Sequence, residues 1–420
     1  MKCIVCESSL AIDVAIIGEQ YPSAIYLDHV TEQEFGLSKS SLNLSQCSNL
    51  KCNLVQLTKP IDLDLVYKHY PYESKTTATM ISILSNVVNE ALLFQTLKPG
   101  DVVLDIGGND GSLLSLIDRP DCQLINIDAA SNIQQEYDIS NYTYLNSKFN
   151  REAYLSLDAN APHLIFSVAV FYQLNDPLSF LRDVGSIMND ESVFVLQMTY
   201  LNSMYSNNIF DNVVHEHITY FSLQSLMFIA DLAGLKVIGA SIVQSYGGSL
   251  RAYLVRSSSS KILPDLVEST KQILVSEKSN ETDSLESLRK FGENFSEWQV
   301  AATQILNYQF ERYGPIIGMG ASTKGNMLLQ ALGVTSNLMP FILDNNPKKI
   351  GTKTTGSSIP IVNEDEIDKL SINILSLPYY YDDFFKKILQ PKIVKGEFID
   401  FISPLPKPNV TRIHGDSDAK

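Results

Sequence analysis

The sequence predicts an α/β protein with two doubly wound, mostly parallel sheets and a small cysteine-bound module at its N-terminal end. Two units carry this prediction, at residues 101–112 and 313–326, because each combines an apolar strand, a glycine-rich turn and the start of a helix. Further strands alternate with helical segments after each turn, which is the pattern of a parallel sheet with helical crossovers. The third observation is that four of the five cysteines lie within the first 52 residues. A chain of 420 residues is long enough for two or three domains.

The overall composition is that of a well-packed globular protein, with 45% hydrophobic and 19% charged residues. The formal charge of −15 excludes general nucleic-acid binding, because phosphate contacts need clustered Lys and Arg. The longest apolar runs fall short of a membrane span, so no membrane partner is expected. The first residues lack the hydrophobic core of a secretion signal, and we therefore expect a cytoplasmic protein.

The N-terminal cysteines occur as two close pairs, Cys3 with Cys6 and Cys47 with Cys52. In a cytoplasmic protein such pairs hold zinc more often than they form disulfides, and four free thiols are the alternative. Four thiolates close a tetrahedral site and staple a segment that is too small to build its own core. Because a closed site has no open coordination position, we assign the expected zinc to structure and not to catalysis.

The first α/β unit is introduced by a helix over about residues 76–97, which Pro99–Gly100 ends. A buried strand runs from residue 101 into the glycine-rich turn, and a helix starts at Ser112. The alternation continues with strands at 123–127, 163–168 and 192–197 and with a helix at 177–188. The second unit starts at Tyr313 and continues in strands at 341–344, 372–377 and 398–401.

Residues 257–300 are rich in Ser, Lys and Glu, and we expect them to form a solvated helical connector between the two units. The expected division is a zinc-binding module (1–75), a first Rossmann-like domain (76–256), the connector (257–300), a smaller second Rossmann-like domain (301–405) and a polar tail (406–420).

The tripeptide His215-Glu216-His217 is the strongest sign of proton chemistry, because the chain has only 6 histidines. On an extended segment, residues two apart point to the same face, so His215 and His217 are expected on one side and Glu216 on the other. Imidazole gives or takes a proton near neutral pH. A hydrogen-bonded pair of structural histidines and a metal site are the alternatives.

The first glycine turn has the pattern Asp-x-Gly-x-x-x-Gly, and a carboxylate ends the next strand. Its residues are Asp105, Gly107, Gly108, Asn109 and Gly111, with Asp128 on the second strand. Glycines let the backbone approach a ligand, and an acid at that place can accept from ribose hydroxyls. The spacing fits neither a dinucleotide fingerprint nor a phosphate loop. It resembles the S-adenosylmethionine loop of class I methyltransferases, and a merely tight turn is the alternative.

Taken in order, these pieces resemble the nucleotide-sugar C-methyltransferases that alkylate keto sugars. Members of that family have a four-cysteine zinc module, a class I S-adenosylmethionine domain, here 76–256, and a C-terminal Rossmann-like domain. The resemblance covers about residues 1–405. It rests on the cysteine pairs, on Tyr70-x-Tyr72-x-Ser74, and on the segments 105–111, 211–222, 247–251, 318–326 and 344–347.

The resemblance implies methylation of the carbon next to a ketone of a nucleotide-linked sugar. His217 corresponds to the family's base, Glu216 would orient the substrate or tune that base, and His215 is a weaker candidate for the same surroundings. Tyr72, or Tyr70 with less support, would lie over the active site from the loop behind the zinc module. Ordinary packing of an aromatic loop is the alternative for both tyrosines.

The chain departs from the family at several positions. Many members have a tyrosine where this chain has Val214, so a donor to the enolate oxygen is missing, moved or unnecessary. Tyr200, Tyr205 and Tyr220 are the candidates to replace it. Gln173 stands where some members have histidine, and it can hydrogen-bond a sugar hydroxyl but cannot titrate. Tyr246 also stands where histidine is frequent.

The second glycine turn can be interpreted in two ways. Ser322, Lys324 and Asn326 at a helix start suit a diphosphate or sugar contact, and a structural strand-to-helix turn is the equal alternative. Arg251 follows a Gly-Gly-Ser-Leu segment and can bind a phosphate or carboxylate, or form a salt bridge at the edge of the core.

Two other functions compete with the first. One is an O- or N-methyltransferase in which His217 deprotonates a hydroxyl or amine. The other is a zinc-stabilised binding protein without catalytic activity, against which the intact Asp105, Asp128 and His217 count. The sequence makes no prediction of the nucleotide, the sugar, the methylated carbon or the oligomeric state.

Overall fold

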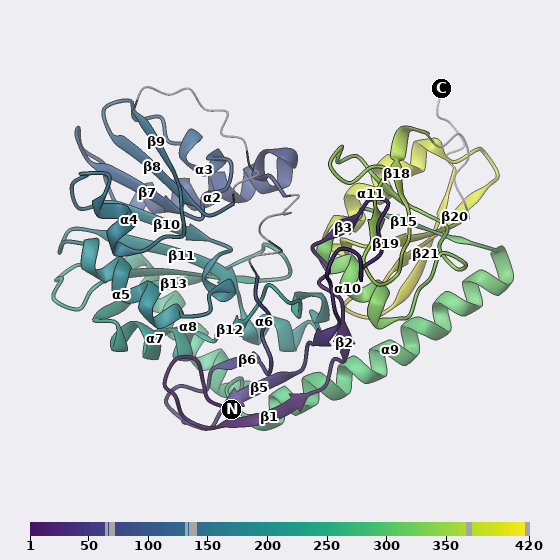
Figure 1. The fold of residues 1–420 in the computed structure, drawn as a ribbon, viewed down its shortest axis with the longest axis horizontal. Helices are drawn as coiled ribbons and strands as arrows, with labels where there is room; N and C mark the ends of the chain where they lie inside the picture. The colour runs from purple at the N-terminus through teal and green to yellow at the C-terminus, as the bar shows by residue number, and fades with distance from the viewer. Residues whose placement is uncertain (64–65, 67–71, 131–132, 134–140, 367–371, 416–420) are drawn as a thin grey trace.

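The computed structural model describes residues 1–63, 66, 72–130, 133, 141–366 and 372–415. It confirms the predicted fold class: two α/β bodies lie side by side, and the N-terminal segment runs along both (Figure 1). Among the described residues, none of the helices combines the length and the apolar composition that crossing a membrane requires.

The first body is built on a seven-stranded sheet in the order β13-β14-β11-β10-β7-β8-β9. The strands are β7 (Val102–Ile106), β8 (Gln123–Asp128), β9 (Tyr142–Asn146), β10 (Leu164–Val168), β11 (Val193–Thr199), β13 (Leu235–Val243) and β14 (Ser249–Arg256). The strands β7 to β11 pair in parallel, whereas β14 is antiparallel to both of its neighbours. The order reverses at β7, and ligands bind at such a switch point in doubly wound folds.

Helices cover both faces of this sheet. One face packs against α5 (Pro177–Ile187) and α7 (Leu223–Leu232), and the other packs against α2 (Ala78–Phe94) and α3 (Ser112–Ser115). The buried side chains of β7 alternate between the two cores, since Leu104 faces the first and Val103 the second. Because β7 is buried on both faces, its residues are apolar except Asp105, and this near-continuous apolar run is why the sequence predicted the strand. The small helices α4 (Arg151–Leu155) and α6 (Leu201–Ser206) connect strands.

The second body has a six-stranded sheet in the order β18-β16-β15-β19-β20-β21. The strands are β15 (Ile316–Met319), β16 (Ile342–Asp344), β18 (Ile361–Asn363), β19 (Asn373–Ser376), β20 (Phe398–Ser403) and β21 (Asn409–His414). All neighbours pair in parallel except β21, which is antiparallel to β20. The helices are α10 (Thr323–Ala331) and α11 (Asp382–Leu389). The prediction of a polar tail over residues 406–420 is therefore wrong in part, because residues 409–414 form the last strand of this sheet.

The N-terminal segment joins the two bodies. A four-stranded antiparallel sheet contains β1 (Leu10–Ala15), β5 (Leu44–Cys47), β6 (Val55–Leu57) and, from the first body, β12 (Thr219–Tyr220). The short pair β2 (Glu19–Gln20) and β4 (Ser40–Ser41) continues it, and β3 (Tyr26–Leu27) pairs with β17 (Lys353–Thr354) of the second body. Because β12 follows the His-Glu-His tripeptide directly, this sheet fixes one end of that motif.

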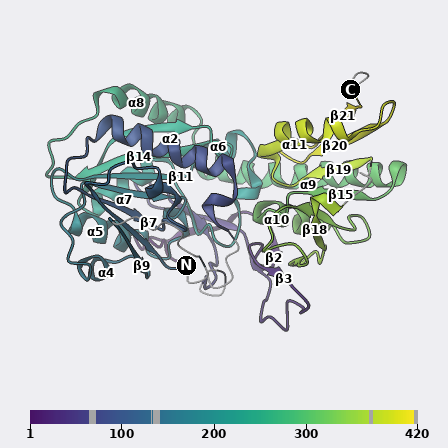
Figure 2. The same ribbon diagram turned by 90° about the horizontal axis from the view of Figure 1, so that it is seen from above.

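The segment expected to be a solvated connector is instead packed. The helix α8 (Pro264–Ser279) lies against β13, and α9 (Leu285–Tyr313) runs along β1 and beneath the second body (Figures 1 and 2). The buried side of α9 consists of Leu288, Phe291, Phe295, Trp298, Ala302 and Leu306. These residues recur every three or four positions, so α9 is amphipathic although its average composition is polar.

Candidate functional site

The first glycine turn joins β7 to α3 at the switch point of the large sheet. Gly107 and Gly111 have φ angles of 72° and 83°, in the left-handed region that glycine adopts without strain. Gly108 is required for a different reason, because a Cβ there would lie 2.6 Å from Oδ2 of Asp105. The carboxyl of Asp105 thus lies under the turn. Its burial and the nearby Asp128 raise the pKa of Asp105 well above its usual value.

Asp128 holds the turn from the neighbouring strand. Its Oδ2 accepts from the backbone N–H of Asn109 at 2.8 Å, and its Oδ1 accepts from that of Ala130 at 2.7 Å. Burial raises the pKa of Asp128, while these two hydrogen bonds oppose that rise. Each carboxylate oxygen has a second lone pair, so the group can still accept from a ligand hydroxyl.

A cavity of about 530 Å³ opens beside this turn, within the range of small-molecule sites. Of the predicted residues it is lined by Asp105, Gly107, Gly108, Asn109, Asp128, Tyr72 and Gln173. Gly111 shapes the turn at the start of α3 and is not among the lining residues. Our sequence reasoning missed Lys148, Phe149, Asp176, Phe180 and Asp183. The signal for Lys148, Phe149 and Asp176 is their place after β9 and β10, because ligands in such sheets bind beyond the carboxyl ends of the strands.

The His-Glu-His tripeptide is not extended, so the expected same-face arrangement of its histidines is wrong. His215 and Glu216 form a turn, which sends the two rings to different neighbours. His215 directs Nε2 towards the backbone carbonyl of Ser40 in β4, at 3.4 Å. His217 directs Nδ1 towards the backbone carbonyl of Asn212, at 2.7 Å.

The hydrogen bond of His217 determines its tautomer. A carbonyl can only accept, so Nδ1 carries the proton and Nε2 keeps a lone pair. Among the described residues, Nε2 has no hydrogen-bond partner. The edge of the ring packs on Tyr172, with centroids 4.3 Å apart, and Tyr172 is followed in the chain by the cavity residue Gln173. His217 is therefore a neutral imidazole with an available acceptor. It does not line the cavity itself, but it contacts Tyr172, the chain neighbour of the lining residue Gln173.

Burial shifts the pKa values of the whole tripeptide. It lowers the pKa of His217 to about 3, with a further contribution from the charge of Lys324, and it lowers that of His215 to about 4. It raises the pKa of Glu216 to about 7. The Oε2 atom of Glu216 is buried and has no hydrogen-bond partner within the described part of the chain. A carboxyl in this state is available to a polar ligand.

The second body reaches this motif through Lys324 near the start of α10. Its Nζ donates to the side-chain oxygen of Asn212 and lies 3.5 Å from the hydroxyl of Tyr380. It also lies over the rings of Tyr246 and Tyr380, at 5.2 and 5.1 Å. The hydroxyl of Tyr380 donates to Oδ2 of Asp211 at 2.7 Å. Both bodies therefore contribute to the surroundings of His217.

Three predicted substrate residues have internal partners. Ser322 caps α10 by accepting from the N–H of Gly325 at 2.9 Å, and the amide of Asn326 donates to the carbonyl of Ser23 at 3.1 Å. The guanidinium of Arg251 is buried and donates to Glu90 at 2.7 Å. These contacts favour a structural role over substrate binding for all three residues. Tyr70 lies outside the described residues.

The tyrosines considered as substitutes for the missing one at Val214 are spread out. Tyr205 packs on Phe291 of α9 at 5.3 Å, and Tyr200 neighbours Glu277, so neither faces the tripeptide. Tyr220 is buried beside Glu216, whose charge contributes to the raised pKa of its hydroxyl.

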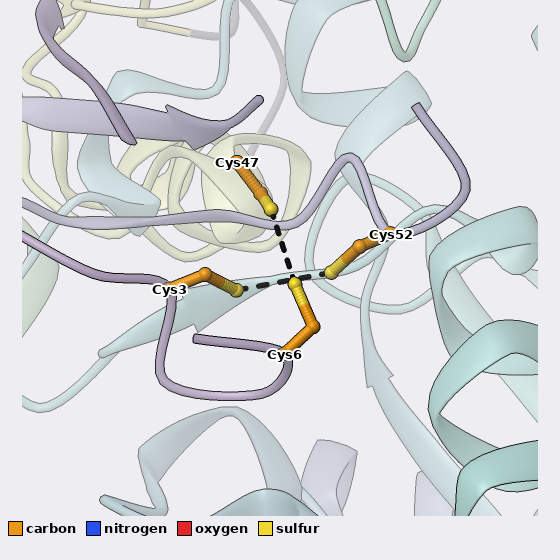
Figure 3. A group of neighbouring side chains, drawn as sticks. All are labelled: Cys3, Cys6, Cys47 and Cys52. Atoms are coloured by element: carbon orange, nitrogen blue, oxygen red, sulfur yellow. Dashed lines mark hydrogen bonds between the residues drawn. The ribbon is translucent and has the colours of Figure 1, made fainter. Parts of the chain in front are cut away.

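The four N-terminal cysteines converge on one centre, as Figure 3 shows. Their sulfur atoms lie within 4.8 Å of one another, with 3.8 Å between Cys3 and Cys52 and 3.4 Å between Cys6 and Cys47. These separations are too long for disulfides, whose bond is about 2.05 Å. They suit the four corners of a tetrahedral metal site, in which sulfurs about 2.3 Å from the ion lie about 3.8 Å apart.

Methyltransferase family models match residues in both bodies of the structure. The family model described as "Methyltransferase domain" matches residues 79–240, and "C-methyltransferase C-terminal domain" matches residues 244–406. The C-methyltransferase NovU of Streptomyces niveus is 25% identical over 419 residues, which cover 97% of this chain and 96% of that protein.

Solved structures match a smaller part of the chain. The methyltransferase in complex with the Haloferax volcanii Trm112 activator is 16% identical, with a TM-score of 0.35 over 42% of this chain and 92% of that one. CalO1, a methyltransferase in calicheamicin biosynthesis with SAH bound, is 14% identical, with a TM-score of 0.33 over 42% of this chain and 55% of that one.

Proposed function

We propose that the chain is an S-adenosylmethionine-dependent C-methyltransferase that methylates the carbon next to the ketone of a nucleotide-linked sugar. The proposal is supported by the similarity to a C-methyltransferase along nearly the whole chain and by the two methyltransferase family models that match it. The observation that carries the proposal is the fixed tautomer of His217, whose Nε2 is an unprotonated acceptor. A ketone makes the neighbouring C–H acidic enough for such a base to remove its proton.

His217 performs the first step. Its Nε2 takes the α proton, and the electrons of the broken C–H bond move into the enolate of the sugar. When bound, S-adenosylmethionine would supply the electrophilic methyl group for the enolate carbon, and its sulfonium would leave as a neutral thioether. The carbonyl of Asn212 accepts from Nδ1–H throughout, and it stabilises the imidazolium that forms when Nε2 is protonated.

The first glycine turn positions the cofactor. The backbone of Gly107 and Gly108 would lie against the cofactor, and Asp128 would accept from its ribose hydroxyls while keeping its hydrogen bonds to the N–H groups of Asn109 and Ala130. The proposal is supported by the cavity that opens beside these residues.

Groups of the tripeptide and of the cavity would orient the substrate. Glu216 is suited to a sugar hydroxyl, because its buried Oε2 has no partner among the described residues. Tyr72 and Gln173 line the cavity and can approach the same ligand. We propose only a structural role for His215 near the site, since its ring is directed towards β4.

For the cysteine centre we propose a structural zinc ion held by Cys3, Cys6, Cys47 and Cys52. The distances between the sulfurs and the all-thiolate donor set fit tetrahedral Zn²⁺. The metal centre would stabilise the N-terminal sheet, which includes β12. Because β12 follows His217 closely in the chain, the centre would also restrain the position of that histidine.

The test is methyl transfer from S-adenosylmethionine to a panel of thymidine-, GDP- and CDP-linked 4-keto sugars in deuterated water, followed by intact mass. Gain of one methyl with loss of the α proton establishes C-methylation and names the nucleotide. Deuterium uptake without methyl gain shows a working base and a wrong acceptor. A protein that binds the cofactor but gives neither result contradicts the proposal. It would favour O- or N-methylation, which needs no exchange at carbon.

A further inference from the structure

The contact between α10 of the second body and the segment before the tripeptide has a chemical consequence. Residues 210–212 form a single 3-10 turn, η3, that packs against α10. Asn212 at the end of this turn is bonded at two places. Its side-chain oxygen accepts from Lys324, and its backbone carbonyl accepts from Nδ1–H of His217 at 2.7 Å. One residue thus links the ammonium of one domain to the imidazole of the other.

The neighbouring groups hold Lys324 in this orientation. Tyr380 lies 3.5 Å from Nζ through its hydroxyl, which itself donates to the buried carboxyl of Asp211. The rings of Tyr246 and Tyr380 cover the ammonium. Two of the three N–H donors of Lys324 are directed at protein atoms, and the charge of Asp211, on the same 3-10 turn as Asn212, supports the charged form of the lysine. A lysine placed mainly to bind substrate would keep its donors free.

We propose that Lys324 is a positioning residue for the base: by holding Asn212 it fixes the tautomer and direction of His217, so the base is competent only when the C-terminal domain is docked. This inference rests on the proposed function, since it assigns His217 the role of base. The second glycine turn would then serve to position the base, which differs from both interpretations considered from the sequence, a diphosphate or sugar contact and a structural turn.

A second lysine provides a matched comparison. Lys349 also lies at the second glycine turn, where it donates to the carbonyl of Ala321 at 2.7 Å and covers the ring of Tyr26 at 5.2 Å. Tyr26 belongs to β3 of the N-terminal segment, so Lys349 faces that segment and not η3. Both lysines are largely desolvated, which lowers the pKa of each. They differ in whether they contact Asn212.

The charged and titratable groups around His217 define the pH response. They are Lys324 from α10, Asp211 from η3, Tyr172 from the turn after β10, Tyr380 from the turn after β19, and the adjacent Glu216. The cation opposes protonation of His217, and its loss therefore raises the pKa of the imidazole towards its usual value. Loss of the cation also makes Asp211 harder to ionise, and a neutral Asp211 no longer favours the imidazolium, which works against the shift. The charge of Asp211 is not among the causes that set the pKa of His217, so the rise is still expected.

The experiment uses the full chain and the variants K324M, K324R, N212A, K324M/N212A and K349M. Two readouts are compared: ¹⁵N imidazole resonances, with His217 assigned through H217N among the 6 histidines, and the pH dependence of deuterium exchange into the accepted keto sugar. We expect K324M to replace the single Nδ1–H tautomer by a mixture and to slow exchange on the order of 10²-fold. The acid limb of the exchange profile should move to higher pH.

The double variant tests whether Lys324 acts through Asn212. If it does, N212A resembles K324M and the double variant is no slower than the slower single one, because both remove the same link. K324R should restore part of the rate, and K349M should leave tautomer and rate unchanged. A K324M protein with the wild-type tautomer, profile and exchange rate overturns the inference. If wild type itself shows no exchange with any sugar, the proposed function fails, while the tautomer readout still tests the link.

Discussion

The two glycine turns of this chain are built alike but serve different surroundings. In the first, Asp128 at the end of β8 accepts from the N–H of Asn109 in the turn, at 2.8 Å. In the second, Asp344 at the end of β16 accepts from the N–H of Ala321, at 2.7 Å. The other oxygen of each carboxylate accepts from the N–H two residues further on, at 2.7 Å in both cases. An acid on the second strand thus pins each turn.

The surroundings of the two turns differ. The first turn opens on the cavity of about 530 Å³. The second is closed by its own domain, since a Cβ on Gly320 would lie 2.7 Å from Pro378 and one on Gly325 would lie 2.5 Å from Leu377. Its lysine extends to Asn212 of the other body. The same local hydrogen bonds therefore build a ligand loop in one domain and a contact between domains in the other.

The largest expected effect separates chemistry from cofactor binding. H217N should lower turnover by on the order of 10²–10⁴-fold, the usual contribution of a general base, while S-adenosylmethionine affinity at the first turn stays near wild type. Steady-state kinetics and calorimetry measure the two quantities. Near-normal turnover would show that another group is the base.

The cysteine centre lies apart from both turns, so its loss tests how far they depend on a common frame. C47S should lower zinc content and the melting temperature, because structural zinc contributes to folding. Chelation of the wild-type protein should give the same change. Metal analysis and thermal melts provide the measurement, and C122S, at a buried cysteine outside the cluster, is the control for metal content. Full occupancy with unchanged melting would mean that the cysteines are not ligands.

Glu216 belongs to neither glycine turn, and its buried carboxyl gives a prediction on pH. Its pKa is raised from 4.5 to about 7, so between these values the folded protein holds a proton that the unfolded chain lacks. Stability contributed by Glu216 should fall as pH rises from about 4.5 to about 7, by about 3 kcal/mol in total. E216Q should remove this decline. Denaturant unfolding of both proteins at several pH values isolates the difference, and parallel curves would contradict the assignment.

The smallest effect tests the comparison most directly. D128A should weaken S-adenosylmethionine binding by about 1–3 kcal/mol, the cost of losing a charge-assisted hydrogen bond. D344A removes the equivalent acid of the second turn, so it should destabilise the C-terminal domain without changing cofactor affinity. Calorimetry with each variant decides. Equal losses of affinity would mean that the second turn also contributes to the cofactor site.

Much of the fold was predictable because local patterns dictated it. The strands β7 and β8, the turn between β7 and α3, and the acid Asp128 follow from apolar runs, from glycines with positive φ and from a carboxylate at a strand end. The cysteine pairs likewise converge as their ligand chemistry indicated. The packing of α9 was not predicted, because its average composition is polar. The spacing of its apolar residues by three or four positions is the signal in the sequence that indicates a buried side.

Local patterns in the chain are enough to predict the class of the fold, the two glycine turns and an imidazole next to a carboxyl. The directions of the two histidine rings, towards Ser40 and towards Asn212, depend on tertiary contacts, since a turn at His215–Glu216 stands where an extended backbone was expected. The tertiary structure also brought Lys324 to Asn212 across 112 positions of sequence and committed Arg251 to Glu90. The physical reason is that turns and strand ends are set by neighbours in the chain, whereas a buried charge is satisfied by whichever partner packing places beside it.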